Sequence, residues 1–343
     1  MFKRILIAGL GSIGSRHRLI VSKLFPEVRV GILSSKITLE SAEAVTHVPT
    51  FEAAREFSPE VAVICTPAPT HVPLALALAD HGTHLLIEKP ISHNRVGILE
   101  LIEKCHKNKS ILMVGYNLRF LKSLQEFRNH LINGIVGEVF SVRCDVGQNL
   151  ESWRPYDDYR NSVSAIKDLG GGVLLELSHE IDYLRWIFGE VDWVRATLLR
   201  QGNLEIDVED TVHLTLGFSS QTSSRPLVAQ LNMDFIRHDN TRCCTVIGDK
   251  GTLRWDGIKG EVAFFPRYGK SWTTYFHDSK GLDETYLLEW INFIESIKER
   301  SSPAVQGKDG LRVIEIIEAA QESAKTGIQI PVIRSSNKAM GEI

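Results

Sequence analysis

Short apolar runs alternate with helical patterns in the first third of the chain. The apolar runs lie at residues 3–8, 28–33, 61–65, 85–87 and 111–115. Between them, residues 13–24, 71–81 and 95–107 have the spacing or the alanine and leucine content of helices. Strands that are apolar throughout and separated by helices are typical of a parallel sheet buried on both faces. The pattern therefore predicts a doubly wound α/β domain at the N-terminus.

The pattern changes after about residue 120. Helices are predicted at 121–132 and 173–188, on either side of a long strand at 139–146. Strands then follow one another through turn residues, at 194–200, 211–218, 228–233, 245–247 and 251–255. Helices return at 283–300 and 310–325. Strands joined by turns indicate a mostly antiparallel sheet, so the second part is predicted to be an α+β domain.

Length and composition agree with two globular domains. The 343 residues exceed the size at which one core usually stops growing. The net charge of −3, without a basic run, argues against nucleic acid and membrane surfaces as partners. No membrane span or signal-peptide core is recognisable, so a cytoplasmic protein is expected. The five cysteines form no C-x-x-C pair, so we expect reduced thiols and no metal.

A glycine-rich motif directly follows the first predicted strand and opens the first helix. In such a G-x-G-x-x-G motif the glycines allow a tight turn, a close pyrophosphate and close helix–strand packing. The helix N-terminus adds free N–H groups and a positive dipole end. The motif predicts a Rossmann dinucleotide-binding domain. We expect its cofactor contacts at Gly9, Gly11, Ser12, Ile13 and Gly14.

The end of the second strand bears on the choice between NAD and NADP. An acidic residue there would bind the ribose 2′-hydroxyl of NAD. The sequence instead has Ser34, Ser35 and Lys36, and hydroxyls with a cation suit a 2′-phosphate. We therefore expect NADP or NAD as cofactor, with NADP favoured. The alternative is that these residues form a polar loop without a role in binding.

Further motifs occur in order along the chain, each at a strand end or a helix start. They are Thr66-Pro67 with His71, Glu88-Lys89-Pro90, the Gly-Tyr-Asn-Leu-Arg-Phe segment at 115–120, and Gly170-Gly171-Gly172 before His179 and Asp182. Their combination, over nearly the whole chain, resembles the glucose–fructose oxidoreductase / inositol dehydrogenase family (Gfo/Idh/MocA). Members mostly oxidise or reduce a carbon of sugars, cyclitols or related molecules, held between a Rossmann domain and an open-faced antiparallel α/β domain.

The resemblance implies a division of the chain and a set of cofactor contacts. We place the Rossmann domain at 1–120, the substrate-binding and oligomerisation domain at 121–333, and a frayed polar tail at 334–343. The implied cofactor contacts are Thr66, Pro67, His71, Glu88, Lys89, Asn117 and Arg119. In relatives the lysine of the Glu-Lys-Pro motif lies near the nicotinamide. An ammonium at this strand end also suits stabilisation of an alkoxide, so Lys89 is a candidate catalytic residue.

The helix predicted at 173–188 carries the remaining catalytic candidates. A helical wheel places Glu176, His179 and Tyr183 on one side, with Asp182 beside them, opposite a buried stripe. His179 is the natural general base, because an imidazole titrates near pH 6.5, that is, about neutrality. The family carries a carboxylate four residues before this histidine. Here that position is Leu175, so Glu176 is expected to substitute. Asp182 either orients His179 or forms an ion pair.

A polar, aromatic-rich loop before the three glycines is expected to bind substrate. Aromatic rings stack on sugars, and arginines bind carboxylates or phosphates. The expected substrate contacts are Tyr116, Trp153, Arg154, Tyr159 and Arg160. The loop is similar to that of family members in bacterial surface-sugar pathways. Packing on the helix or on a partner subunit is the alternative.

Three functions fit these patterns. The first is a dehydrogenase or reductase of a sugar, nucleotide sugar or cyclitol. The second is a non-catalytic NAD(P)-binding sensor of the same fold, against which Lys89 and His179 argue. The third is a reductase of a non-sugar ring, such as a bile pigment. The open sheet face implied by the resemblance predicts a homodimer or homotetramer.

Overall fold

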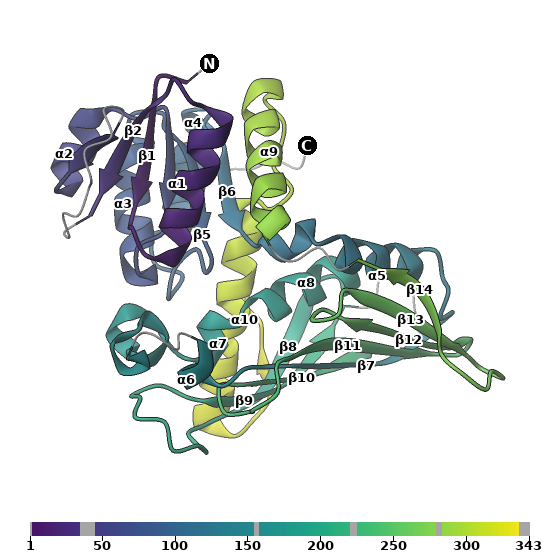
Figure 1. Cartoon of the computed structure of the whole chain (residues 1–343). Helices are drawn as coiled ribbons and strands as arrows, with labels where there is room; N and C mark the ends of the chain where they lie inside the picture. Colours follow the sequence, from purple (N-terminus) through teal and green to yellow (C-terminus); the bar gives the residue numbers. More distant parts are fainter. Residues whose placement is uncertain (1, 35–44, 154–157, 220–224, 279–282, 336–343) are drawn as a thin grey trace. The chain divides into compact units, whose positions relative to one another are not determined.

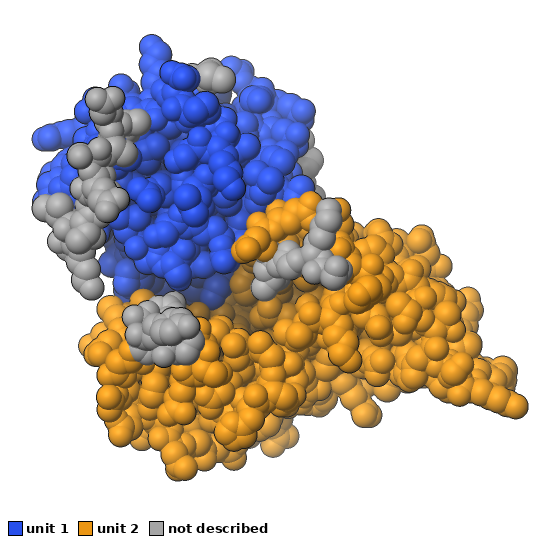
Figure 2. All heavy atoms as spheres, viewed as in Figure 1, with its two compact units in different colours: residues 1–116, 286–314, 337–343 blue, residues 117–285, 315–336 orange. Residues whose placement is uncertain are grey.

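The computed structural model describes residues 2–34, 45–153, 158–219, 225–278 and 283–335. They form two compact units, coloured blue and orange in Figure 2. Unit 1 contains Met1–Tyr116 and Tyr286–Ile314, and unit 2 contains Asn117–Thr285 and Glu315–Ser336. Residues 286–314, placed in the second domain on sequence, thus group with unit 1.

Unit 1 is built on a sheet whose strands pair in parallel. The described strands run in the order β3-β2-β1-β4-β5-β6. Their bounds are β1 Arg4–Ala8, β2 Arg29–Leu33, β3 Val45–Val48, β4 Val61–Ile64, β5 His84–Glu88 and β6 Leu112–Gly115. Helices α1 (Ser12–Leu24), α2 (Phe51–Phe57), α3 (His71–Ala79) and α4 (Ile98–Lys107) connect them (Figure 1). The predicted Rossmann sheet is confirmed, with the short β3 and α2 as additions.

Residues 286–314 complete unit 1. Helix α9 (Asp283–Glu299) buries Trp290 and Phe293, and α10 (Gly307–Thr326) begins beside β6. The backbone N–H of Val114 donates to the Val305 carbonyl at 3.1 Å, which ties the segment before α10 to the edge strand. A Cβ at Gly310 would lie 3.0 Å from Ile91 and Val114, so a small residue allows this approach.

Unit 2 contains a mixed, mostly antiparallel sheet. Its described strands run in the order β14-β13-β12-β11-β7-β10-β9-β8-β15, and β10 pairs with β7 in parallel. The bounds are β7 Val139–Gly147, β8 Val191–Leu199, β9 Thr211–Phe218, β10 Leu227–Asp234, β11 Thr241–Gly248, β12 Gly251–Asp256, β13 Glu261–Pro266, β14 Thr273–His277 and β15 Ile330–Pro331. The expected open-faced α+β architecture is confirmed.

Helices cover one face of this sheet and leave the other to polar side chains. On the covered face, under α5 (Lys122–Ile132), Trp255 packs against Phe127 and Tyr183 with ring centroids 6.4 and 5.5 Å apart. On the opposite face, strand register aligns Arg195, Arg143 and Arg254 in one row. The neighbouring row contains Asp145, Asp256 and Glu261. The open face is thus charged, with basic and acidic rows side by side.

Candidate active site

The glycine motif forms a tight turn between β1 and α1. Gly9 has a φ of +95°, and a Cβ there would lie 2.7 Å from the Cys65 carbonyl oxygen. A Cβ at Gly14 would lie 1.9 Å from the Gly9 carbonyl oxygen, so the third glycine lets the helix pack against the turn. A Cβ at Gly11, by contrast, would meet no atom within 4 Å. The outer side of this turn is therefore free for a ligand to approach the backbone.

The start of α1 fits a bound pyrophosphate. Gly11 is the N-cap, no side chain caps the helix, and its first turn contains no acidic residue. Uncapped N–H groups at a positive helix end attract anions. Gly11 and Ser12 are exposed and Ile13 is half-buried, so the described residues leave this end accessible. The turn therefore suits the phosphates of a dinucleotide.

The residues that bear on NADP lie at the limit of the described chain. Ser34 follows β2 and is half-buried, and its carbonyl oxygen lies 2.9 Å from Nε2 of His47. Ser35 and Lys36 lie outside the described residues. The expected preference for NADP thus stays a prediction.

His71 links the turns that follow β4 and β5. Its Nδ1 lies 3.0 Å from the carbonyl oxygen of Pro90, and its Nε2 contacts the carbonyl of Thr66. The ring is 2% exposed, and burial lowers the pKa of His71 because it disfavours the charged form. His71 thereby connects the Thr66-Pro67 turn to the Glu-Lys-Pro turn through its two ring nitrogens. Thr66 and Pro67 themselves are half-buried at the carboxyl end of β4.

The Glu-Lys-Pro motif lies at the carboxyl end of β5, where α/β sheets bind their ligands. Glu88 is 7% exposed, Lys89 is half-buried and Pro90 is buried. One oxygen of Glu88 accepts from the backbone N–H of Lys89 at 3.2 Å. A Cβ at Gly115 would lie 3.1 Å from the Glu88 carboxyl, so a glycine on β6 makes room for this acid. The backbone of Lys89 therefore lies between Glu88, which accepts its N–H, and the buried Pro90.

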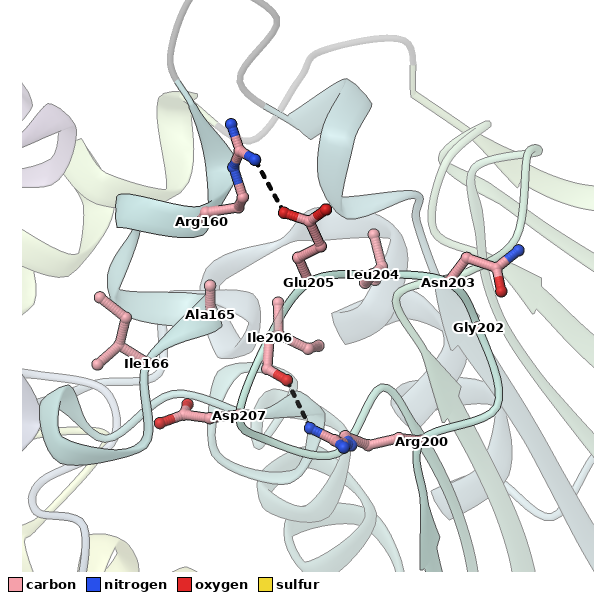
Figure 3. A pocket seen from close by; sticks show the side chains of 10 residues that line it. All are labelled: Arg160, Ala165, Ile166, Arg200, Gly202, Asn203, Leu204, Glu205, Ile206 and Asp207. Atoms are coloured by element: carbon pink, nitrogen blue, oxygen red, sulfur yellow. Dashed lines mark hydrogen bonds and ion pairs between the residues drawn. The ribbon is translucent and has the colours of Figure 1, made fainter.

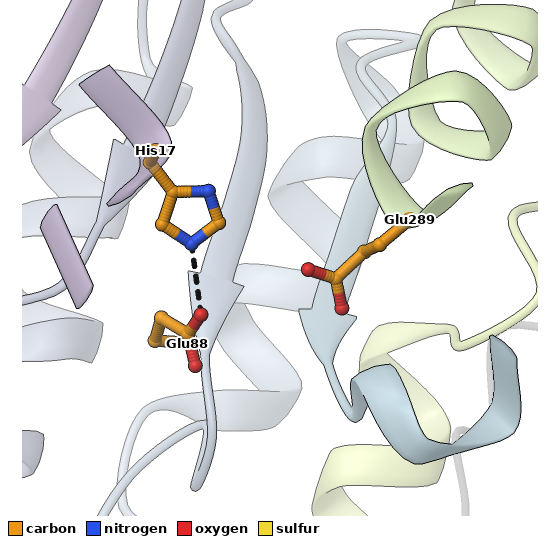
Figure 4. A group of neighbouring side chains, drawn as sticks. All are labelled: His17, Glu88 and Glu289. Atoms are coloured by element: carbon orange, nitrogen blue, oxygen red, sulfur yellow. Dashed lines mark hydrogen bonds and ion pairs between the residues drawn. The ribbon is translucent and has the colours of Figure 1, made fainter. Parts of the chain in front are cut away.

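Sequence analysis missed the side chains that surround Glu88. His17 of α1 lies 2.8 Å from Glu88 through Nε2 and 2.8 Å from the Trp290 indole nitrogen through Nδ1. Glu289 of α9 is fully buried nearby (Figure 4). The spacing of residues in α1 could have indicated this contact. Its buried residues Gly14, His17 and Val21 are three and four positions apart and so lie on one face of the helix.

In unit 2, two of the three glycines allow other groups to pack closely against the chain. A Cβ at Gly171 would lie within 2.9 Å of three carbonyl oxygens, those of Val163, Ser164 and Ile166. Gly172 has a φ of +104°, and its missing side chain makes room for Glu209. Glu209 accepts from the backbone N–H of Leu174 at 2.9 Å and so caps the helix that follows. Burial raises the pKa of this carboxyl.

The helix predicted at 173–188 is two helices, α7 (Val173–Glu176) and α8 (His179–Phe188). Within residues 170–185, all of which the structure describes, every side chain is buried except those of Glu176 and His179. The two lie on either side of the break. The single helical wheel was wrong for Tyr183, which is fully buried under the sheet with its hydroxyl 3.6 Å from the Cys144 sulfur.

Asp182 forms an ion pair, the second of its two expected roles. The guanidinium of Arg119 donates to both carboxylate oxygens, at 2.8 and 2.6 Å, and the two side chains are 6% and 2% exposed. Asn117 is also buried, and its amide donates to the hydroxyl of Thr285 at 2.8 Å. Tyr116, expected at the substrate, is fully buried. Direct contacts of these residues with cofactor or substrate stay predictions.

The aromatic loop is described only in part. Arg154 lies outside the described residues, while Trp153, which ends the short helix α6 (Leu150–Trp153), packs on Phe235 with ring centroids 5.6 Å apart. The hydroxyl of Tyr159 accepts from the backbone N–H of Glu205 at 3.1 Å. Arg160 donates to Asp158 and Glu205 at 2.9 and 2.8 Å.

A cavity of about 610 Å³ lies beside Arg160. Its other wall is the loop at 200–207, where Arg200 donates to the carbonyl of Ile206 at 2.7 Å (Figure 3). Both arginines are thus engaged by acceptors of this unit. A substrate anion at this cavity would have to compete with the carboxylates of Asp158 and Glu205.

Comparison with known proteins agrees with this architecture. The model described as "Oxidoreductase family, NAD-binding Rossmann fold" matches residues 3–116. The model described as "Oxidoreductase family, C-terminal alpha/beta domain" matches residues 128–332. The chain belongs to the Gfo/Idh/MocA family, and it is an NAD(P)-dependent oxidoreductase.

Similar proteins in the family include two inositol dehydrogenases. Myo-inositol 2-dehydrogenase of Thermotoga maritima is 26% identical over 93% of this chain and 96% of its own. Inositol 2-dehydrogenase of Rhizobium meliloti is 26% identical over 97% of this chain and all of its own. Among the described helices, none is long and apolar enough to cross a membrane.

Solved structures share the fold at lower identity. A levoglucosan dehydrogenase in complex with NADH and L-sorbose superposes with a TM-score of 0.82 and 21% identity, covering 97% of this chain and 99% of that chain. The WlbA dehydrogenase from Bordetella pertussis, in complex with NADH and UDP-GlcNAcA, gives 0.79 and 21%, covering 97% and 99%. At this identity the likeness supports the fold alone.

Proposed function

We propose that this protein transfers a hydride between the nicotinamide of NAD(P) and a carbinol or carbonyl carbon of a sugar, nucleotide sugar or cyclitol. One observation carries the proposal. In the buried stretch at 170–185, only Glu176 and His179 reach the surface. A stretch that buries all other side chains and leaves an acid and an imidazole accessible is suited to proton transfer.

Each residue has a role in the proposed reaction. The bound nicotinamide takes the hydride of the carbinol carbon. His179 accepts the hydroxyl proton, and the ammonium of Lys89 donates a hydrogen bond to the same oxygen as it gains alkoxide character. Glu176 orients His179 from the preceding turn. Asp182 acts one step further away, by holding Arg119 through its bidentate ion pair.

The substrate class follows from relatives and from the aromatic loop. The relatives act on inositol, and the structural neighbours hold L-sorbose or UDP-GlcNAcA. Trp153 and Tyr159 offer rings for a sugar face, and Arg160 offers a cation, as members in surface-sugar pathways would require. The cytoplasm is the compartment we propose, as all five cysteines are free.

Turnover of a small panel tests the proposal. Purified protein is mixed with NAD or NADP and with myo-inositol, levoglucosan, L-sorbose or a UDP-sugar, and NAD(P)H absorbance is followed. With the substrate so found, Lys89→Ala and His179→Ala should each lower kcat by roughly 10²–10⁴ and leave NADH affinity intact. The exposed Lys107 and His238 provide control variants, Lys107→Ala and His238→Ala. NADH binding without turnover of any panel member would contradict the proposal and favour a sensor.

A further inference from the structure

Three polar side chains meet beneath the Glu-Lys-Pro turn of unit 1. His17 comes from α1, Glu88 from β5 and Glu289 from α9, and one polar atom of each lies within 4.8 Å of the other two. His17 and Glu289 are fully buried and Glu88 is 7% exposed. Figure 4 shows the Glu289 carboxyl directed toward the other two side chains. The mechanism above gives Glu289 no role.

The neighbour of His17 fixes the direction of the hydrogen bonds. An indole N–H is only a donor, so Trp290 Nε1, at 2.8 Å, must donate to Nδ1 of His17. The imidazole proton therefore lies on Nε2 and is donated to Glu88 at 2.8 Å. Glu88 also accepts from the N–H of Lys89. Two donors are therefore directed at the carboxyl of Glu88, whereas no described donor reaches that of Glu289.

The direction of the His17 hydrogen bonds argues against a metal ion bound by these three side chains. A histidine and two glutamates have the composition of a divalent-metal site. A metal would need the Nε2 lone pair of His17, and that nitrogen carries the proton given to Glu88. Binding a metal would require breaking the Trp290 bond inside a closed core.

No described hydrogen-bond donor offsets the burial of the Glu289 carboxyl. Both of its carboxyl oxygens are buried without a hydrogen-bond partner among the described residues. The titratable groups around it are His17, Cys65, Glu88 and Tyr286. The guanidinium of Arg16 lies over the Tyr286 ring at 4.7 Å. Burial, and then the charge of Glu88, raise the pKa of Glu289 well above its ordinary value.

We propose that the two acids carry a single negative charge, which lies on Glu88 while Glu289 remains protonated. In this arrangement, His17 and Glu88 position Lys89. The second part rests on the proposed function of Lys89. An ionised Glu289 would repel Glu88 and compete with it for the single proton of His17. A neutral Glu289 leaves Glu88 bound to His17 on one side and to the Lys89 backbone on the other. Glu88 and His17 are thus positioning residues.

The first experiment measures stability and needs no substrate. Denaturant unfolding of wild type and Glu289→Gln is followed at about pH 5 and about pH 8. A raised folded pKa stabilises below the unfolded pKa of about 4.5, and this contribution is lost as pH rises. Glutamine cannot lose a proton. The unfolding constant of wild type relative to Glu289→Gln should therefore rise with pH, by at most about tenfold per unit.

The matched control is Glu295→Gln, an exposed glutamate of the same helix, for which the ratio should stay flat. A Glu289→Gln variant that is destabilised equally at both pH values would overturn the shared charge. So would stabilisation of wild type, but not of the variant, by added ZnCl₂ or MnCl₂, which would reveal a cation site.

The second experiment tests positioning. His17→Leu removes the bond to Glu88, whereas His17→Gln retains a side-chain N–H donor. A displacement of about 1 Å at a reacting group costs up to roughly 100-fold in rate. With the substrate identified above, His17→Leu should lower kcat at least about tenfold and change the NADH Kd less than about threefold, and His17→Gln should restore most of kcat.

Equal losses of kcat and NADH affinity, or no recovery in His17→Gln, would overturn the positioning role. The stability experiment would still decide the shared charge. If the panel gives no turnover at all, the positioning role fails together with the proposed function, and unfolding against pH again decides the charge separately.

Discussion

Each unit contains a pair of buried acidic side chains, and the two pairs are compensated in opposite ways. In unit 2, Asp182 meets Arg119 in a bidentate pair, and Glu180, also fully buried, lies 2.7 Å from Nε of Arg242. In unit 1, Glu289 has no described cation beside it, and its nearest carboxylate is that of Glu88. These two acids of unit 2 are compensated by guanidinium groups, whereas in unit 1 one acid is compensated by an imidazole and the other stays neutral.

The two units also differ in the charges that they present at their surfaces. Unit 1 presents the uncapped positive end of α1 to an anionic cofactor. Unit 2 pairs charges inside its core and also arranges them in opposite rows on its open face. An ion pair requires one geometry of its two side chains. A protonated carboxyl, in contrast, can be replaced by an amide of similar shape.

Removal of Asp182 should produce the largest effect. Asp182→Ala takes the carboxylate from a guanidinium that is 6% exposed, and breaking such a buried pair costs about 3–5 kcal/mol. The free energy of unfolding, measured by denaturant at neutral pH, checks this. Asp168→Asn, at an exposed position of unit 2, is the control.

A double variant sharpens the same point. Arg119→Met with Asp182→Leu removes both charges and should recover most of the loss, because apolar replacements of similar volume compensate for a buried pair. A single variant that costs less than about 1 kcal/mol would show that the pair is as weak as a surface one, and the contrast between the units would disappear.

Glu180→Gln should have a smaller effect, because its partner Arg242 is 16% exposed and retains some hydration. We expect a loss of about 1–3 kcal/mol in the free energy of unfolding. Glu289→Gln, the same chemical change in unit 1, should not destabilise at about pH 8. Equal losses from the two substitutions would remove the distinction between paired and neutral acids.

The charged rows of the open face predict self-association. A twofold axis in the plane of the interface, parallel to the two rows and midway between them, would set the basic row of one copy against the acidic row of another. Arg143→Glu breaks the basic row and should shift a dimer or tetramer toward monomer, more strongly at low salt. Light scattering at micromolar concentration measures this, with Lys107→Glu of unit 1 as control. A monomeric wild type would exclude the assembly.

The smallest expected effect concerns the cofactor. We expect NADPH to bind at least as well as NADH, because a cation at Lys36 and the hydroxyls of Ser34 and Ser35 replace an acidic residue. Fluorescence titration of both nucleotides tests this, and Lys36→Ala should reduce any NADPH preference by about 0.3–1 kcal/mol in binding. An NADH preference that is unchanged in Lys36→Ala would contradict it.

Sequence periodicity found long elements and missed short or interrupted ones. β1, α1, β4 and β9 were predicted within one or two residues because each buries a continuous or regularly spaced apolar set. β3, β13, β14, β15 and α2 were not individually predicted. A wheel drawn through 173–188 could not register the break at Leu177 and Ser178. It therefore placed Tyr183 on a polar face, when its ring lies in the core.

By itself, the sequence determined which residues form the dinucleotide turn, where the Glu-Lys-Pro motif ends its strand, and that His179 lies in a helical stretch after three glycines. These are local properties, set by glycine conformations and by hydrophobic spacing within a few residues. Only the tertiary structure decided that Asp182 binds Arg119 and that His17, Glu88, Glu289 and Trp290 share one core. His17 and Trp290 are 273 residues apart, and no local pattern encodes a hydrogen bond over that separation. Burial by distant segments, which sets the charge of each acid, exists only once the chain has folded.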